Sequence, residues 1–307
     1  MSRLATTLCG VPLRNPIVAA AGTAGYGPEI AEVVPASTFG AVTTKSITPE
    51  SRVGNDPWRV TDLPAGMLNA IGLANVGLER FMSAVLPELA LLDTVIIGSI
   101  AGHRLDDYVE VASAFAGSEA NPLRLVELNV SCPNTSTGRQ FGDDPDLLAE
   151  LVTEVAAVLR GKPLLVKLSA GAPDPVGLAE IAVDSGASGI TVTNTMPAMA
   201  IDPETRRSRI GRASGGLSGS AIHPIAVRFV HEMHRRLDDS IPIVGLGGVM
   251  SWSDAAEFTL AGARAVGVGT GLFVDPRIVA RLVRGLDRWV GRQGVGSIAD
   301  LVGRFEP

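Results

Sequence analysis

Short apolar runs recur eight times along this chain, and most are followed by a longer stretch with the residue spacing of a helix. Alternating βα units favour parallel strands that are buried on both faces. Eight units predict an α/β fold closed as a (β/α)8 TIM barrel, although an open doubly wound sheet also fits the pattern. The predicted strands are Ile17–Ala20, Ala41–Lys45, Val95–Ile100, Leu125–Val130, Leu164–Leu168, Gly189–Asn194, Ile243–Leu246 and Ala265–Val268.

Three kinds of segment surround these strands. Asp144 and Pro145 read as a helix N-cap and first helical residue, with further helices expected over 175–185, 223–237, 253–261 and 276–290. An N-terminal β-hairpin is expected over 4–13, with its turn at Cys9 and Gly10. The segments 48–77 and 196–219 read as long strand-end loops, which in compact domains are usually lids or binding loops. Residues 1–307 are therefore expected to form a single domain.

Composition excludes several classes of protein. Hydrophobic residues make up 46% of the chain, and its net charge of −6 opposes binding to nucleic acid. The two cysteines, Cys9 and Cys132, cannot form a disulfide framework, which fits a cytoplasmic location. No apolar run is long enough to suggest a membrane anchor. His231 and His234 lack the spacing of a zinc-protease helix and read as an exposed helix face, so no metal site is expected.

Polar side chains lie at or near the ends of five predicted strands. Barrel enzymes carry their chemistry at the carboxyl ends of the strands, so these residues are expected to converge on one site. They are far apart in the sequence, and only closure of the barrel would bring them together. These residues are Lys45, Ser99, Asn129, Lys167 and Asn194.

Two local patterns suggest specific chemistry. The stretch Glu127–Asn134 runs from a strand into a polar loop that contains Cys132, where a thiol can act as a proton acceptor. A lone cysteine is otherwise most often a small buried apolar residue. Glycine clusters at 245–248 and 267–271 follow the last two strands, where barrels often hold a phosphate group.

With these motifs in view, the sequence resembles the class 1 dihydroorotate dehydrogenases nearly from end to end. The stretch 66–73 resembles class 1B in particular, whose members pass electrons to NAD through a separate subunit. The other matching stretches are Thr43–Ser46, Glu127–Asn134, Val166–Leu168, Asn194–Thr195, Gly215–Gly219 and the two glycine clusters.

This resemblance implies an FMN enzyme that oxidises dihydroorotate to orotate. Cys132 would remove the proton from C5 while hydride leaves C6 for N5 of FMN, and Lys167 would stabilise the negative charge of reduced FMN. The partners implied are an electron-transfer subunit carrying FAD and an iron–sulfur cluster, and a second copy of the chain. The implied substrate-binding residues are Lys45, Met67, Asn69, Gly72, Leu73, Asn129, Asn134, Asn194 and Thr195. The implied FMN-binding residues are Ala21, Gly22, Lys45, Ser46, Ser99, Asn129, Lys167, Gly219, Gly247, Gly248, Gly269 and Thr270.

Other functions remain open from the sequence. Ser99 stands where class 1B usually has Asn, which leaves room for a relative that acts on another dihydropyrimidine. A tRNA dihydrouridine synthase is disfavoured by the acidic balance of the chain. A cofactor-free barrel lyase or isomerase, or a barrel without catalytic activity, would bind no flavin.

Overall fold

The eight apolar runs form a closed parallel barrel at the centre of a computed structural model, which describes residues 2–117, 121–131 and 140–306. Each strand pairs with the next barrel strand along the chain, and the last pairs with the first. This closure confirms the TIM barrel and excludes the open sheet. The barrel strands are β3 (Ile17–Ala19), β4 (Ala41–Thr43), β7 (Val95–Ile100), β8 (Leu123–Asn129), β9 (Leu164–Ser169), β10 (Gly189–Asn194), β15 (Ile243–Leu246) and β16 (Ala265–Val268).

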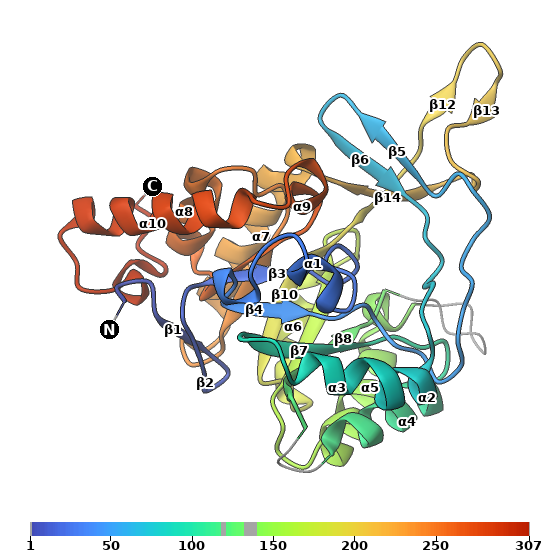
Figure 1. Cartoon of the computed structure of the whole chain (residues 1–307), viewed down its shortest axis with the longest axis horizontal. Helices are drawn as coiled ribbons and strands as arrows, with labels where there is room; N and C mark the ends of the chain where they lie inside the picture. Colours follow the sequence, from blue (N-terminus) through green and yellow to red (C-terminus); the bar gives the residue numbers. More distant parts are fainter. Residues whose placement is uncertain (1, 118–120, 132–139, 307) are drawn as a thin grey trace.

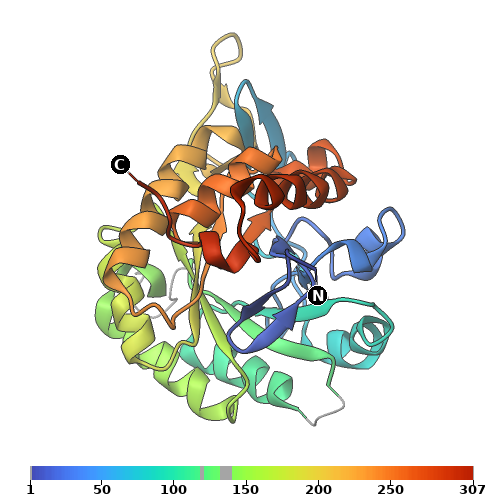
Figure 2. The same ribbon diagram turned by 90° about the vertical axis from the view of Figure 1, so that its left-hand side faces the viewer.

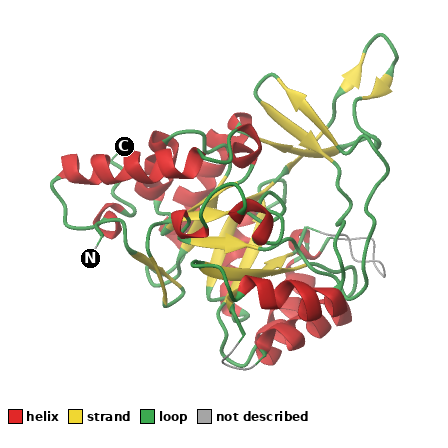
Figure 3. Ribbon diagram, viewed as in Figure 1, coloured by secondary structure: helices red, strands yellow, loops and turns green. Residues whose placement is uncertain are grey.

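Helices form the outer layer around the strands (Figure 3). Asp144 caps α5 (Pro145–Val158) as expected, because its carboxylate accepts hydrogen bonds from the N–H groups of Asp146 and Leu147 at 3.1 Å. Among the described residues, no helix is both long enough and apolar enough to cross a membrane. The helices are α1 (Pro28–Ala31), α2 (Leu78–Arg80), α3 (Leu86–Leu89), α4 (Leu105–Ala116), α5 (Pro145–Val158), α6 (Pro175–Asp184), α7 (His223–Arg236), α8 (Trp252–Ala261), α9 (Thr270–Val274) and α10 (Ile278–Gln293). A π-helical segment, Phe81–Val85, joins α2 to α3, and short 3-10 turns occupy Ala36–Thr38, Phe141–Asp143, Ser220–Ile222 and Ile298–Leu301.

The predicted hairpin lies across the amino-terminal end of the barrel, the end that faces the viewer in Figure 2. It consists of β1 (Thr6–Leu8) and β2 (Val11–Leu13), paired antiparallel. Apolar side chains of the hairpin pack with the lowest inward-facing side chains of the barrel and so close this end. The members of this cluster are Leu8, Val11, Leu13, Val18, Ala41, Ile97, Leu125, Leu165, Val244 and Ala265.

The two segments expected as long loops instead contribute a second, four-stranded sheet. Its strand order is β11-β14-β6-β5, and Figure 1 shows it projecting from the barrel away from the hairpin. Residues such as Asn69 and Gly216 pair across it although they are far apart in the sequence. The local pattern is rich in glycine and proline and does not alternate strictly, so no strand signal can be recognised there. The strands are β5 (Val60–Leu63), β6 (Gly66–Asn69), β11 (Met196–Ala198) and β14 (Gly215–Ser218), with a small separate hairpin of β12 (Ile201–Asp202) and β13 (Arg207–Ser208).

Two details of the expected elements are corrected. β4 ends at Thr43 and not at Lys45. The N–H of Thr44 still bonds the carbonyl of Ile97 in β7 at 2.9 Å, but that of Lys45 bonds the carbonyl of Gly25 at 3.0 Å instead of a barrel strand. His231 and His234 do not form an exposed face, because both are half-buried. The ring of Phe305, in the C-terminal segment, lies edge-on to that of His231 at 5.4 Å. His231 therefore helps to hold the C-terminal segment against α7.

Candidate active site

A pocket with about 850 Å³ of empty space, including its open mouth, lies between the carboxyl ends of the barrel strands and the four-stranded sheet. The barrel supplies its floor, while β5, β6 and β14 supply one wall. Side chains predicted from distant parts of the sequence therefore line one space. The predicted residues that line it are Ala21, Gly22, Met67, Asn69, Lys167, Asn194, Thr195, Gly219, Gly247, Gly248, Gly269 and Thr270.

Gly247 and Gly248, which follow β15, form a part of the pocket wall that consists of backbone without side chains, called here the glycine corner. Their φ angles are 151° and 67°, a region that L side chains rarely adopt. A Cβ at Gly248 would lie 2.8 Å from both the carbonyl oxygen of Gly219 and the Cβ of His223. The backbone can therefore approach a bound group closely here, as a phosphate-binding loop requires.

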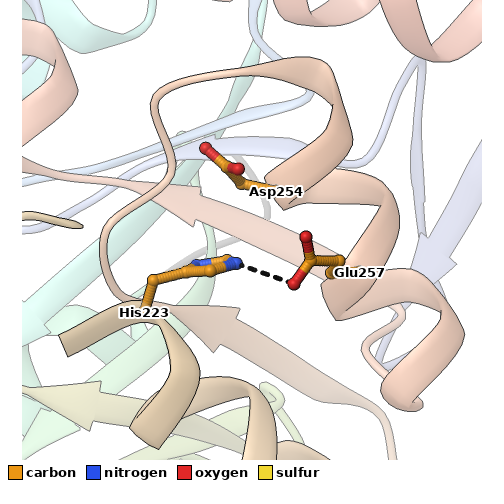
Figure 4. A group of neighbouring side chains, drawn as sticks. All are labelled: His223, Asp254 and Glu257. Carbon is orange, nitrogen blue, oxygen red and sulfur yellow. Dashed lines mark ion pairs between the residues drawn. The ribbon is translucent and has the colours of Figure 1, made fainter. Parts of the chain in front are cut away.

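His223, the first residue of α7, holds this corner in place. Its Nδ1 lies 2.9 Å from the carbonyl oxygen of Gly247, and its Nε2 lies 3.4 Å from the carboxylate of Glu257. Figure 4 shows His223 and Glu257 facing each other, with Asp254 beside them. The imidazole therefore links the glycine corner to α8.

These three side chains also have the composition of a metal site, since their ligand atoms lie within 4.8 Å of one another. However, one carboxylate oxygen of Asp254 already accepts the N–H groups of Met250 and Ser251, both at 2.8 Å, as the cap of α8. Because His223 is likewise bonded to Gly247, the cluster is explained by its role in holding the loop and the helix.

An amide network connects the ends of β8 and β10 at the pocket. The Nδ2 of Asn194 donates to the Oδ1 of Asn129 at 3.0 Å and to the Oγ of Ser131 at 2.9 Å. The Oδ1 of Asn194 accepts the N–H of Thr195 at 2.8 Å. On the opposite wall, the Nδ2 of Asn69 donates to the carbonyl of Gly216 at 3.0 Å. Such amides supply the donors and acceptors that an imide-like ring requires.

Several predicted residues do not line this pocket. Ser99 is fully buried, and its Oγ lies 2.8 Å from that of Ser46. Asn129 reaches the pocket only through Asn194. Gly72 and Leu73 line a separate open groove with Arg52 and other residues.

Lys45 is also absent from the pocket wall and is half-buried. Burial lowers the pKa of this lysine, the cation of Arg59 lowers it further, and the carboxylate of Glu29 acts in the opposite direction. A lysine with a lowered pKa gives up its proton more easily than an ordinary surface lysine.

The expected base, Cys132, and the expected substrate ligand Asn134 lie outside the described residues. The last residue described before them, Ser131, accepts a hydrogen bond from Asn194. The strand end that precedes Cys132 is therefore tied to the amide network of the pocket.

Sequence reasoning did not identify a set of mainly apolar side chains in the wall. Val60 and Phe273 stand at the pocket and are 44% and 57% exposed. Apolar residues in loops and short helices carry no distinguishing sequence signal. Ile71, Ser218 and Leu246 lie within stretches noted for their resemblance but were not singled out. The lining residues missed are Ala20, Thr23, Val60, Ile71, Thr193, Ser218, Ile222, Leu246 and Phe273.

Known proteins resemble this chain over nearly its whole length. The model of the dihydroorotate dehydrogenase family matches residues 3–290. A Solibacter usitatus protein named "Putative dihydroorotate dehydrogenase A (fumarate)" is 45% identical, with 99% of each chain covered. The Geobacillus kaustophilus protein named dihydroorotate dehydrogenase B (NAD(+)), catalytic subunit, is 43% identical over 99% of this chain and 96% of its own.

A solved structure resembles the fold as well. It is that of DHODH from Eimeria tenella in complex with ferulenol, with a TM-score of 0.81 and 23% sequence identity, covering 99% of this chain and 89% of that one. The similarity confirms the barrel, and the sequence matches confirm the resemblance noted from the motifs. This chain belongs to the dihydroorotate dehydrogenase family.

Proposed function

We propose that this chain, as a single domain over residues 1–307, uses FMN to oxidise dihydroorotate to orotate. The observation that carries the proposal is one pocket that combines a bare glycine corner, a buried lysine and two asparagines from opposite walls. These residues match the needs of a phosphate, an electron-accepting ring and a polar pyrimidine. Membership of the family supports the same activity.

The residues of the pocket fit a flavin mononucleotide. Gly247, Gly248 and Gly269 would hold its phosphate through backbone N–H groups, with Thr270 and Gly219 beside them. Lys167 is 5% exposed and lines the same pocket, so its cation faces the space where the ring would lie. A bound FMN supplies the acceptor for the hydride that leaves C6 of dihydroorotate.

Asn69, Asn194 and Thr195 would hold the pyrimidine ring and the carboxylate of the substrate. Asn129 would orient Asn194, to which it is bonded. Cys132 would remove the proton from C5, with Asn134 on the same loop as a further ligand. Because only a thiolate can accept this proton, reduction of the enzyme should accelerate as pH rises through the ionisation of the thiol.

The test is anaerobic stopped-flow absorbance of the yellow holoenzyme mixed with dihydroorotate. We expect rapid bleaching of the flavin, and we expect Cys132→Ala to stop bleaching without releasing FMN. Cys9→Ser is the matched control and should behave as the wild type. Dihydrouracil serves as the comparison substrate for the alternative that the enzyme acts on another dihydropyrimidine. A colourless protein that does not take up FMN would refute the proposal.

The proposal also includes the protein that accepts the electrons from the reduced flavin. Trp58, Val60 and Phe273 are exposed apolar side chains, and the last two stand at the pocket mouth, which suits docking of an electron-transfer subunit with FAD and an iron–sulfur cluster. Names of the relatives include both fumarate and NAD(+) forms. We expect the isolated chain to reduce NAD slowly, whereas efficient reduction of fumarate would favour the other form. A homodimer and a cytoplasmic location also remain predictions.

A further inference from the structure

A carboxylate is buried inside the barrel, below the pocket, and the proposed chemistry does not use it. Glu127 of β8 is 4% exposed. Its Oε2 accepts a hydrogen bond from the Oγ1 of Thr191 at 3.0 Å, while its Oε1 has no hydrogen-bond partner within the described part of the chain. Burial of a carboxylate is costly unless a positive charge or sufficient donors compensate it.

The cation nearest to this carboxylate in the strand pattern is Lys167. On β9, between β8 and β10, Lys167 stands opposite Thr191 in register, while Glu127 stands opposite Leu165, two residues before the lysine. Alternate residues of a strand share a face, and Leu125 and Leu165 both belong to the cluster at the barrel floor. Glu127 and Lys167 therefore both point into the barrel, with the lysine nearer the pocket.

The two side chains are neighbours without being a close ion pair. No ion pair within 4.0 Å is found for either among the described residues. Thr191 holds the carboxylate from the far side of β9, so Glu127 is fixed below the lysine. The negative charge of Glu127 can therefore change the electrostatic potential of the pocket, because its field adds to that of Lys167. In a barrel interior shielded from water, such a field is only weakly screened.

We propose that Glu127 is a positioning residue that sets the electron affinity of the flavin by offsetting part of the charge of Lys167. This inference rests on the proposed function, because it requires FMN above the lysine. With the carboxylate present, the pocket is less favourable to negative charge on the flavin, and reduced flavin returns its electrons more readily. Thr191 keeps the carboxylate at a fixed position beneath the lysine.

Sulfite is a suitable probe, because it adds to oxidised flavins and leaves negative charge on the same part of the ring as reduction does. Glu127→Gln is nearly the same size and still accepts the hydrogen bond of Thr191, so it removes charge while preserving the packing. We expect sulfite to bind the variant holoenzyme on the order of tenfold more tightly than the wild type. A tenfold change corresponds to about 30 mV for a two-electron couple, so the midpoint potential of FMN should rise by a similar amount.

Two further variants separate charge from packing. Thr191→Val disturbs the same part of the barrel but leaves the carboxylate charged, and its sulfite affinity should stay within about threefold of the wild type. Lys167→Gln should weaken sulfite binding, which is the opposite direction. In a Lys167→Gln background, Glu127→Gln should tighten sulfite binding again.

The outcomes distinguish the inference from the proposed function. A yellow Glu127→Gln protein with unchanged or weaker sulfite binding and an unchanged midpoint potential overturns the role of Glu127 alone. Equal effects of Glu127→Gln and Thr191→Val would also overturn it, because packing would then explain both. Failure of the wild-type chain to bind FMN, or no effect of Lys167→Gln, would instead refute the proposed flavin site.

Discussion

Substitution of Gly248 by alanine tests whether the glycine corner of the pocket binds the cofactor. Alanine at the φ angle of 67° costs about 1–2 kcal/mol. The new methyl would lie 2.8 Å from the Gly219 carbonyl and from the Cβ of His223, and overpacking of this kind costs about 1–3 kcal/mol more. Because Gly219 also lines the pocket, relief of the clash would move both sides of the proposed phosphate site.

Gly294→Ala provides the matched control. Gly294 has a φ angle of 71°, its added Cβ would meet no atom within 4 Å, and it caps α10 outside the pocket. Both variants should lose about 1 kcal/mol or more of unfolding free energy in urea. Only Gly248→Ala should raise the FMN dissociation constant, by about tenfold or more, equivalent to about 1.4 kcal/mol, in a fluorescence titration of the apoprotein. Equal FMN affinity in the two variants would refute the assignment of this corner.

Three other predictions concern the surroundings of the site. His223→Ala removes the contact with Gly247 and should weaken FMN binding several-fold, consistent with loss of about 1 kcal/mol; unchanged affinity would mean that the corner is rigid without it. Burial raises the pKa of Cys9 to about 12 from 9.0, so the unfolded chain ionises first and the free energy of unfolding should fall as pH rises from 9 towards 12. In urea titrations, the free energy of unfolding of Cys9→Ala should decrease less between pH 9 and 12 than that of the wild type. The same pH dependence in both proteins would contradict the raised pKa of Cys9. Leu8→Ala should lower the free energy of unfolding by about 2–5 kcal/mol while leaving FMN affinity intact, and a loss of affinity would show that the barrel floor influences the pocket.

The barrel could be predicted because its strands are short apolar runs that local pattern identifies. Seven of the eight expected strands begin at the residue where the structure begins them, and β8 begins two residues earlier than expected, at Leu123. The last residues of the strands were harder to predict than the first, as the second strand shows, which was expected to extend to Lys45. A strand ends where its hydrogen bonds to the neighbouring strand end, and the local sequence does not reveal that point. The four-stranded sheet was missed for the same reason. Pairing of β6 with β14 depends on segments that only the closed barrel brings together.

The candidate site was predictable where chemistry is tied to strand ends. Lys167 and Asn194 line the pocket because they lie near the carboxyl ends of β9 and β10, which face it. Ser99 shows the limit, since a position near a strand end does not determine whether a side chain faces the pocket or, as here, bonds Ser46. The role inferred for Glu127 could not be predicted from the sequence either, because only the folded barrel shows that this carboxylate is buried beneath the pocket.

The pairing of β16 with β3 constrains how this protein can be made. The N–H of Val266 bonds the carbonyl of Pro16 at 2.8 Å, and that of Ile298 bonds the carbonyl of Arg3 at 2.8 Å. During synthesis, the edge of β3 that pairs with β16 therefore stays without its partner until Ala265–Val268 has left the ribosome. An exposed edge of this kind invites pairing with other chains. Pairing of β16 therefore removes the last edge of the barrel at which an incomplete chain could associate with another.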